Sequence, residues 1–181
     1  RQSTVRTIYE LTVQRGDAGV FAMPGSTGNL THSSQGALIA IEVEGNGCSI
    51  GPNPVDTAKA SASKTIALFA LPGAFTPTCS AKHVPGYVEK AAALKAAGID
   101  EIWCVSVNDA FVMGAWGKDQ KAGDKVMMLG DGNGEFTQAM GLTMDGSKFG
   151  LGTRSQRYAM IVDNGVIKEL FVEKPGAFEV S

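Results

Sequence analysis

The chain has 181 residues, of which 44% are hydrophobic and 19% charged, enough for one domain with a full core. Its net charge of -2 offers no basic surface to nucleic acid or to an anionic membrane, so we expect neither as a partner. No apolar run approaches the ~20 residues that span a bilayer. The first residues lack the apolar core of a secretory signal.

The three cysteines, Cys48, Cys79 and Cys104, are too few and too odd a number for a disulfide framework. This count favours a reducing compartment, in which a cysteine is either buried and inert or retained for its reactivity. We therefore expect a cytoplasmic protein.

The N-terminal part of the chain has the weakest patterns. Two β-like runs, Thr7–Val13 and Ala37–Glu44, flank a stretch rich in Gly, Ser and Thr, and the glycines and prolines of residues 45–54 indicate a loop. We expect residues 1–40 to be a divergent, hairpin-like extension that packs on a main domain at residues 41–181. The chain is then a single domain overall.

The pattern becomes clear from residue 64 onward. Lys64–Leu71 is a continuous apolar run ended by Pro-Gly, which is typical of a central strand buried on both faces. Ser80–Ala97 carries apolar residues near helical spacing and ends at Gly98. Pro85 predicts a kink or a weak first turn in this helix.

The second half continues the alternation of strands and helices. The further predicted elements are a strand (Glu101–Val107), a helix capped by Asn108 or Asp109, a strand (Lys125–Asp131), a short helix (Gly134–Met140) and a hairpin (Arg157–Glu173) with a type I′ turn at Asn164-Gly165. This order predicts an α/β fold with a central mixed sheet flanked by helices on both faces. In such sheets the reactive crevice lies beyond the carboxyl ends of the strands, where Cys79 falls.

Cys79 stands at the predicted start of a helix, in the stretch LPGAFTPTCSAKHVPGY. An ordinary thiol is mostly protonated at neutral pH, and only the thiolate attacks. The helix start supplies partial positive charge and free N–H groups, and the Thr76 hydroxyl can donate to the sulfur. Arg154 and Arg157 are candidates for a full positive charge.

A buried, inert cysteine is the alternative interpretation, because cysteine is among the most buried residue types. The spacing of Pro72, Thr76 and Cys79 at a strand-to-helix crossing favours reactivity instead. Pro72 and Pro77 also stiffen the loop and shield the sulfur from bulk water.

Three stretches, LPGAFTPTCSAKHVPGY, SVNDAFVMGAW and RYAMIVDNGVIKEL, closely resemble the peroxiredoxin family, in its type II or peroxiredoxin-5-like branch. The resemblance runs from about residue 41 to residue 180. It implies a thioredoxin-like fold without a cofactor. It also implies a thiol-dependent peroxidase that reduces hydrogen peroxide and alkyl hydroperoxides to water or alcohol through a cysteine sulfenic acid. The implied reductant is glutathione with glutaredoxin, or thioredoxin.

The resemblance also assigns roles to residues. The peroxidatic nucleophile falls on Cys79, the motif proline and threonine on Pro72 and Thr76, and the active-site arginine on Arg157. Thr76, Arg157 and the backbone N–H groups of Thr78 and Cys79 would hold the two peroxide oxygens. Arg154 is a helper at best.

The other two cysteines lie outside the motif around Cys79. In plant-like members of the branch, a cysteine that matches Cys104 is proposed to resolve the sulfenic acid through an internal disulfide. Its place in a central strand favours structural burial instead, because a bridge to Cys79 would require the helix start to unwind. Cys48 is expected to be a surface or interface thiol.

Two other functions compete with the peroxidase. One is a peroxide-sensing thiol switch of the same fold, in which oxidised Cys79 is a signal and not a turnover step. The other, a disulfide reductase, is disfavoured because Cys79 has no partner at C-x-x-C spacing.

His83 follows Cys79 by four residues, a spacing that could serve a metal ion. The chain has only one other histidine, His32, and no C-x-x-C, so no metal site is expected. We expect His83 to make a local hydrogen bond, to pack at a subunit contact or to support the loop.

The resemblance implies a homodimer whose contact face includes the loop around Cys79. Phe75, Pro77 and Phe111 are the candidates for this face, although core packing is equally compatible with Phe111. The chain ends at GAFEVS, where the family usually continues into a final helix, so that helix is expected to be absent.

Overall fold

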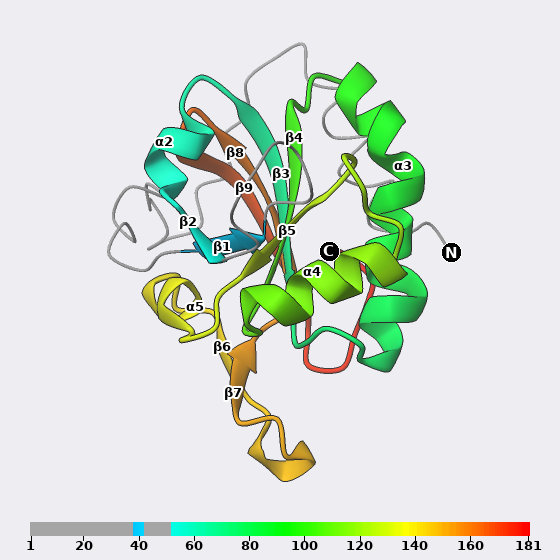
Figure 1. Ribbon diagram of the computed structural model, residues 1–181, viewed down its shortest axis with the longest axis vertical. Helices are drawn as coiled ribbons and strands as arrows, with labels where there is room; N and C mark the ends of the chain where they lie inside the picture. The colour runs from blue at the N-terminus through cyan, green and yellow to red at the C-terminus, as the bar shows by residue number, and fades with distance from the viewer. Residues whose placement is uncertain (1–37, 42–51) are drawn as a thin grey trace.

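The fold is built on a seven-stranded mixed sheet in the computed structural model, which describes residues 38–41 and 52–181 (Figure 1). The strand order across the sheet is β2-β1-β5-β4-β3-β8-β9. The strands are β1 (Leu38–Ile41), β2 (Pro52–Val55), β3 (Thr65–Leu71), β4 (Glu101–Ser106), β5 (Met127–Gly130), β8 (Tyr158–Asp163) and β9 (Val166–Val172). The central strands β3, β4 and β5 are parallel, and the strands outside them pair antiparallel.

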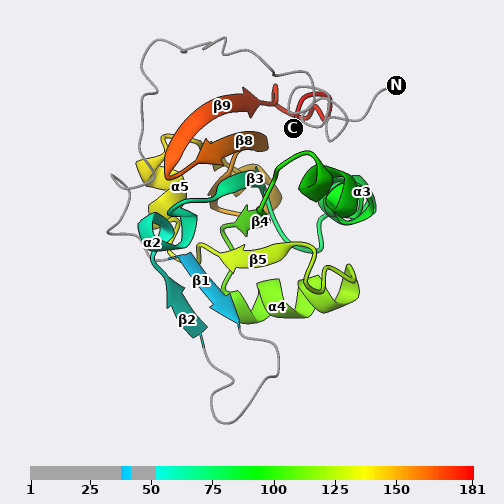
Figure 2. The same cartoon turned by 90° about the horizontal axis from the view of Figure 1, so that it is seen from above.

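Helices cover both faces of this sheet, as Figure 2 shows from above. The helices α3 and α4 lie on one face, and α2 and α5 lie on the other. The helical elements are α2 (Thr57–Ser61), the π-helical turn η2 (Cys79–His83), α3 (Val84–Ala96), α4 (Ala110–Asp119), α5 (Glu135–Ala139) and the 3-10 turn η3 (Ser147–Phe149).

The side chains of β3 alternate between two apolar clusters, one on each face of the sheet. Phe69 and Leu71 join the cluster under α3 and α4, whereas Ile66 and Leu68 join the cluster on the opposite face. All four side chains are fully buried. Because both faces of a central strand are covered, its sequence is a continuous apolar run, as predicted. The run ends where Pro72 begins the loop that leads to Cys79.

The mixed sheet flanked by helices is confirmed, and so is the turn between β8 and β9. Asn164 and Gly165 both have positive φ, at 48° and 77°, as a type I′ turn requires. The weak first turn predicted around Pro85 takes the form of η2, in which five residues form a wider π-helical turn before α3 begins. Pro85 stands at the start of α3, where its missing N–H is tolerated.

The loop predicted for residues 45–54 is wrong at its end. Pro52–Val55 forms β2, which pairs antiparallel with β1. Proline fits there because β2 is the outermost strand, where a missing N–H donor costs no ladder hydrogen bond on the open side. The predicted boundary between residues 40 and 41 falls inside β1, and the predicted strand Thr7–Val13 lies outside the described residues.

Besides β2, four elements were not predicted from the sequence. They are α2, the 3-10 turn η3 and the two strands of a separate antiparallel ribbon, β6 (Thr143–Asp145) and β7 (Thr153–Ser155). This ribbon leads the chain back to Arg157 and β8. Within the described part of the chain, no helix has the length and apolar character needed to span a bilayer.

Candidate active site

Cys79 lies at the start of the helical segment that follows β3. The first i→i−4 hydrogen bond of the segment runs from the Ser80 N–H to the Thr76 carbonyl at 3.0 Å. The N–H groups of Thr78 and Cys79 therefore precede the first bonded turn, where helix N–H groups have no intrahelical acceptor. Cys79 itself is fully buried.

Arg157 donates to both Cys79 and His83 through the two arms of its guanidinium. Its Nη2 lies 3.3 Å from the Cys79 Sγ, and its Nη1 lies 2.8 Å from the His83 Nδ1. Arg157 immediately precedes β8, so the central sheet positions it opposite the helix start. Cys79 and His83 open and close the same π-helical turn, which presents both to one guanidinium.

His83 is neutral in this arrangement. A guanidinium can only donate, so Nδ1 accepts from Arg157 and the ring proton is assigned to Nε2. Burial lowers the pKa of His83 well below its usual value, and the positive charge of Arg157 lowers this pKa further. Nε2 is buried without a hydrogen-bond partner among the described residues.

Aromatic rings enclose the imidazole. The ring centroid of His83 lies 4.9 Å from that of Phe69, 5.7 Å from that of Tyr87 and 5.0 Å from that of Phe178. The predicted local hydrogen bond of His83 is therefore a bond to a distant part of the chain, Arg157, within an aromatic enclosure. The four-residue spacing from Cys79 was the only sequence signal for this role.

The predicted bond from Thr76 to the sulfur is not present. The Thr76 hydroxyl donates its single proton to the Gly73 carbonyl at 2.8 Å, which closes the loop on itself. Pro72 and Thr78 are both half-buried and flank this loop. Among the predicted site residues, the contact to the sulfur comes from Arg157.

Asn108 fastens the Cys79 loop to the end of β4. Its Oδ1 accepts a hydrogen bond from the Ala74 N–H at 2.9 Å and another from the Ser106 hydroxyl at 2.8 Å. The sequence offered two candidates for the cap of α4, and Asp109 is the one that accepts from the Val112 N–H. Asn108 is thereby free to hold the loop.

Arg154 lies against the same loop. Its Nε donates to the Leu151 carbonyl at 2.7 Å and its Nη1 to the Val107 carbonyl at 3.1 Å. A methyl group added at Gly73 would lie 3.2 Å from Nη1, so the guanidinium rests against the loop backbone. Its hydrogen bonds go to these two carbonyls and not to Cys79.

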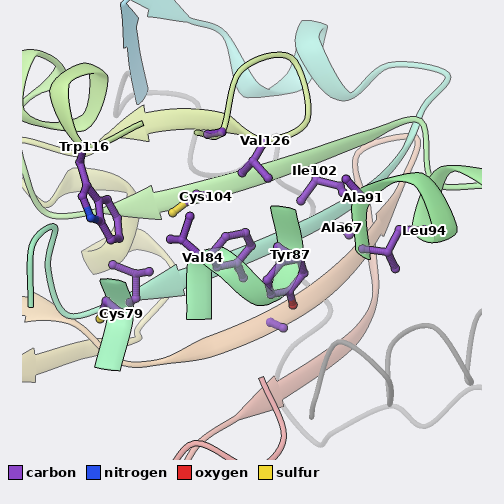
Figure 3. Packing of buried hydrophobic residues seen from close by; sticks show 14 of the residues in the cluster. Ala67, Cys79, Val84, Tyr87, Ala91, Leu94, Ile102, Cys104, Trp116 and Val126 are labelled. Carbon is purple, nitrogen blue, oxygen red and sulfur yellow. The ribbon is translucent and has the colours of Figure 1, made fainter. Parts of the chain in front are cut away.

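Cys104 lies on β4 in the same apolar cluster as Cys79, together with Tyr87 and Trp116 (Figure 3). It is fully buried and carries no disulfide. Burial raises the pKa of the Cys104 thiol well above its usual value, and the nearby Cys79 raises this pKa further. Cys48 lies outside the described residues. No group of three or more potential metal ligands gathers in residues 38–41 and 52–181.

Comparison with known proteins places this site in a family. Residues 35–181 match the Redoxin family. Peroxiredoxin-2E, chloroplastic, from Arabidopsis thaliana is 56% identical over 126 residues, which are 68% of this chain and 54% of the relative. The crystal structure of reduced Prx3 in complex with H2O2 from Vibrio vulnificus is 48% identical, with a TM-score of 0.77 over 88% of this chain and 94% of that chain.

A further solved structure, the X-ray crystal structure of a putative thioredoxin reductase from Burkholderia cenocepacia, is 59% identical, with a TM-score of 0.78 over 80% of this chain and 86% of that chain. These matches define a thioredoxin-like redox protein. The chain belongs to the redoxin family and, within it, to the type II peroxiredoxins. It spans little more than half the length of the chloroplastic Arabidopsis relative, at 54%.

Proposed function

We propose that the protein is a thiol-dependent peroxidase with Cys79 as its peroxidatic nucleophile. The contact between the Arg157 guanidinium and the Cys79 sulfur carries this proposal, because a full positive charge at 3.3 Å favours the thiolate that attacks. The H2O2 complex of the Vibrio relative supports a peroxide as substrate. The lone Cys79, without a C-x-x-C partner, disfavours disulfide reduction, although the Burkholderia relative is named as a thioredoxin reductase.

The reaction begins when the Cys79 thiolate attacks one peroxide oxygen. An S–O bond forms and the O–O bond breaks, so that the sulfur is oxidised to a sulfenic acid and the departing oxygen leaves as hydroxide or alkoxide, which takes up a proton. Arg157 and the N–H groups of Thr78 and Cys79 stabilise the charge on the departing oxygen, where pre-positioned donors lower the barrier. Two equivalents of thiol then reduce the sulfenic acid, releasing water and a disulfide.

The finer assignments extend this proposal. Hydrogen peroxide and alkyl hydroperoxides are the substrates, and glutathione with glutaredoxin, or thioredoxin, is the reductant. A reducing compartment such as the cytoplasm suits the free thiols of Cys79 and Cys104. Pro72 and Thr76 shape the loop that brings the sulfur to the substrate, and the working unit is a homodimer.

The first test combines substitution with steady-state peroxide consumption. Cys79→Ser should abolish turnover because the nucleophile is gone. Arg157→Ala should slow peroxide attack by about a hundredfold or more, the usual effect of removing one transition-state donor. Arg154→Ala is the matched control, with a smaller loss expected because that arginine bonds carbonyls and not the sulfur.

Two results would contradict the proposal. One is wild-type peroxide consumption by Cys79→Ser in the presence of a thiol. The other is consumption by the wild-type protein that stops near one equivalent of peroxide per subunit with thiol in excess, which would identify a peroxide-sensing switch. Parallel assays with glutaredoxin and with thioredoxin identify the reductant.

A further inference from the structure

The segment that follows β9 turns back toward the active site. We call residues 174–181 the C-terminal clasp. It begins with a tight turn in which the Ala177 N–H donates to the Lys174 carbonyl at 2.9 Å, and Gly176 takes a positive φ of 78°. The turn reverses the chain so that the clasp runs beside the strand end it has just left.

Glu173 anchors the clasp at its far end. The Glu173 side chain is buried, and its Oε1 accepts hydrogen bonds from the N–H groups of Glu179, Val180 and Ser181, each at 2.7 Å. The Ser181 hydroxyl adds a fourth bond at 2.9 Å. Hydrogen bonds to an ionised acceptor are about twice as strong as neutral ones. This carboxylate therefore fixes the path of the segment before it.

The same residue is tied to the catalytic arginine through the backbone. The Glu173 N–H donates to the Arg157 carbonyl at 2.9 Å, one step beyond the pairing of Tyr158 with Val172. The anchor of the clasp and the arginine that contacts the sulfur are thus direct neighbours at one end of the sheet.

Phe178 is the residue of the clasp that contacts Arg157 and His83. Its ring centroid lies 5.6 Å from the Arg157 Cζ and 5.0 Å from the centroid of the His83 ring. The guanidinium therefore has an aromatic face on one side, His83 Nδ1 on one arm and the Cys79 sulfur on the other.

Apart from the sulfur, the groups that contact the guanidinium, the His83 imidazole and the Phe178 ring, are electrically neutral. No ion pair between the described residues involves Arg157. A carboxylate would hold the guanidinium firmly but would compensate its charge. An imidazole nitrogen and an aromatic face fix its position and leave that charge for the sulfur and the departing oxygen.

We propose that Phe178, fixed by the attachment of the clasp to Glu173, is a positioning residue that holds the Arg157 guanidinium against Cys79 and His83. The proposal deepens the peroxidase assignment and rests on it for its catalytic consequence. Its structural content, the placement of a positive charge beside the sulfur, can be measured without turnover.

The experiment compares Phe178→Ala, Phe178→Leu and Phe178→Tyr with the wild-type chain. Two readouts are measured, the second-order rate of peroxide consumption and the pH profile of Cys79 alkylation by iodoacetamide. Phe178→Ala should lower the peroxide rate by about tenfold to a hundredfold, the scale of a small misplacement of a catalytic group. It should also move the alkylation profile to higher pH.

The substituted side chains separate positioning from burial. Phe178→Tyr retains the aromatic face and should restore both readouts, whereas Phe178→Leu restores apolar bulk without that face and should not. Phe149→Ala is the matched control, because that phenylalanine is 83% exposed on η3, outside the site. The pH midpoint of alkylation distinguishes two effects of the substitution. Loss of positive charge beside the sulfur moves the midpoint, whereas greater access to the sulfur raises the alkylation rate without moving it. Arg157 is the charged group that contacts the sulfur, and His83 and Cys104 are the titratable groups near it.

A double-mutant cycle tests the role of Glu173. Glu173→Ala should reproduce the effect of Phe178→Ala on both readouts. The double variant should show no larger change than either single variant, because both substitutions act through the same contact. Additive losses would overturn the proposal. So would a Phe178→Ala protein that loses thermal stability but retains both the peroxide rate and the alkylation profile.

Failure of the peroxidase assignment gives a different pattern. If the wild-type chain consumes no peroxide, the assignment fails, and the alkylation profiles still decide whether Phe178 positions Arg157. If peroxide is consumed and Phe178→Ala matches the wild type in both readouts, the assignment stands and the positioning role is rejected.

Discussion

His83 carries no charge in the folded chain, because burial and then the neighbouring Arg157 hold its pKa well below the usual value. In the unfolded chain the imidazole returns to a pKa of about 6.5. Below that pH the unfolded state binds a proton that the folded state excludes. The folded pKa is depressed, so this contribution to stability is complete above the unfolded pKa and is lost as the pH falls.

The resulting prediction concerns the free energy of unfolding between about pH 7.5 and pH 5.5, around the unfolded pKa. For the wild-type chain it should fall with a slope that approaches ~1.4 kcal/mol per pH unit from this one residue. His83→Asn retains an acceptor near the Nδ1 position and cannot titrate, so its slope should be shallower. Denaturant titrations at each pH measure the free energy of unfolding of both proteins and so give both slopes. Since His32 is present in both proteins, equal slopes would contradict the assignment of a neutral His83.

At the scale of elements, the sequence predicted those whose pattern is set by burial on both faces or by local turn chemistry. β3 and β4 are continuous apolar runs, and the Asn-Gly turn between β8 and β9 requires two positive φ values. The edge strand β2 was missed because its prolines indicate a loop unless the open edge of the sheet is known.

The candidate site was predictable to a similar extent. The motif around Cys79 indicated the nucleophile, and the helix start follows from strand and helix patterns. The distribution of hydrogen bonds was not predictable, because it depends on contacts between residues far apart in the chain. Arg157 reaches His83 across 74 positions, and the Thr76 hydroxyl turns to Gly73 because the loop closes on itself.

Whether Cys104 on β4 can form a disulfide with Cys79 depends on how η2 is placed relative to β4. Two cysteines form a bridge only when their Cα atoms lie within about 7 Å, and their side chains must face each other. Cys104 is fixed in the middle of the sheet, because β4 pairs with both β3 and β5. We expect that a bridge would require η2 to unwind so that Cys79 could reach it. The raised pKa of the buried Cys104 thiol also disfavours the thiolate that attacks a sulfenic acid.

We therefore expect Cys104 to be structural. Cys104→Ser should retain peroxide turnover with glutathione and glutaredoxin, at some cost in stability because a buried hydroxyl replaces the thiol. Cys104→Ala, which adds no polar group, is the matched control for folding. Peptide mapping of the oxidised wild-type chain supplies the second readout. A Cys79–Cys104 disulfide, together with loss of turnover in both folded variants, would assign Cys104 a resolving role.

At the scale of the whole molecule, two large aromatic side chains near the active site remain exposed. Phe75 is 56% exposed and Phe111 is 55% exposed, although both lie beside well-packed elements. The Phe75 ring lies 6.3 Å from that of Trp116 on α4, the helix that also carries Phe111. Phe75 also has a positive φ of 58°, a conformation that costs about 1–2 kcal/mol for a residue with a Cβ. A strained backbone that presents an apolar ring to solvent suggests a contact with a second molecule.

A second copy of this chain is the occupant that we expect, in accord with the proposed homodimer. Phe75→Glu and Phe111→Glu should each shift the chain from dimer to monomer in sedimentation velocity, because a dimer contact would bury the introduced carboxylate without a partner. Phe149→Glu is the control, since it adds the same charge at a phenylalanine that is 83% exposed on η3. Figure 1 shows the β6–β7 ribbon, whose strands η3 connects, projecting away from the central sheet. The control should sediment as the wild type does. If the wild-type chain is a monomer at all concentrations tested, or if both Phe75→Glu and Phe111→Glu remain dimeric, the contact face does not include this pair of rings.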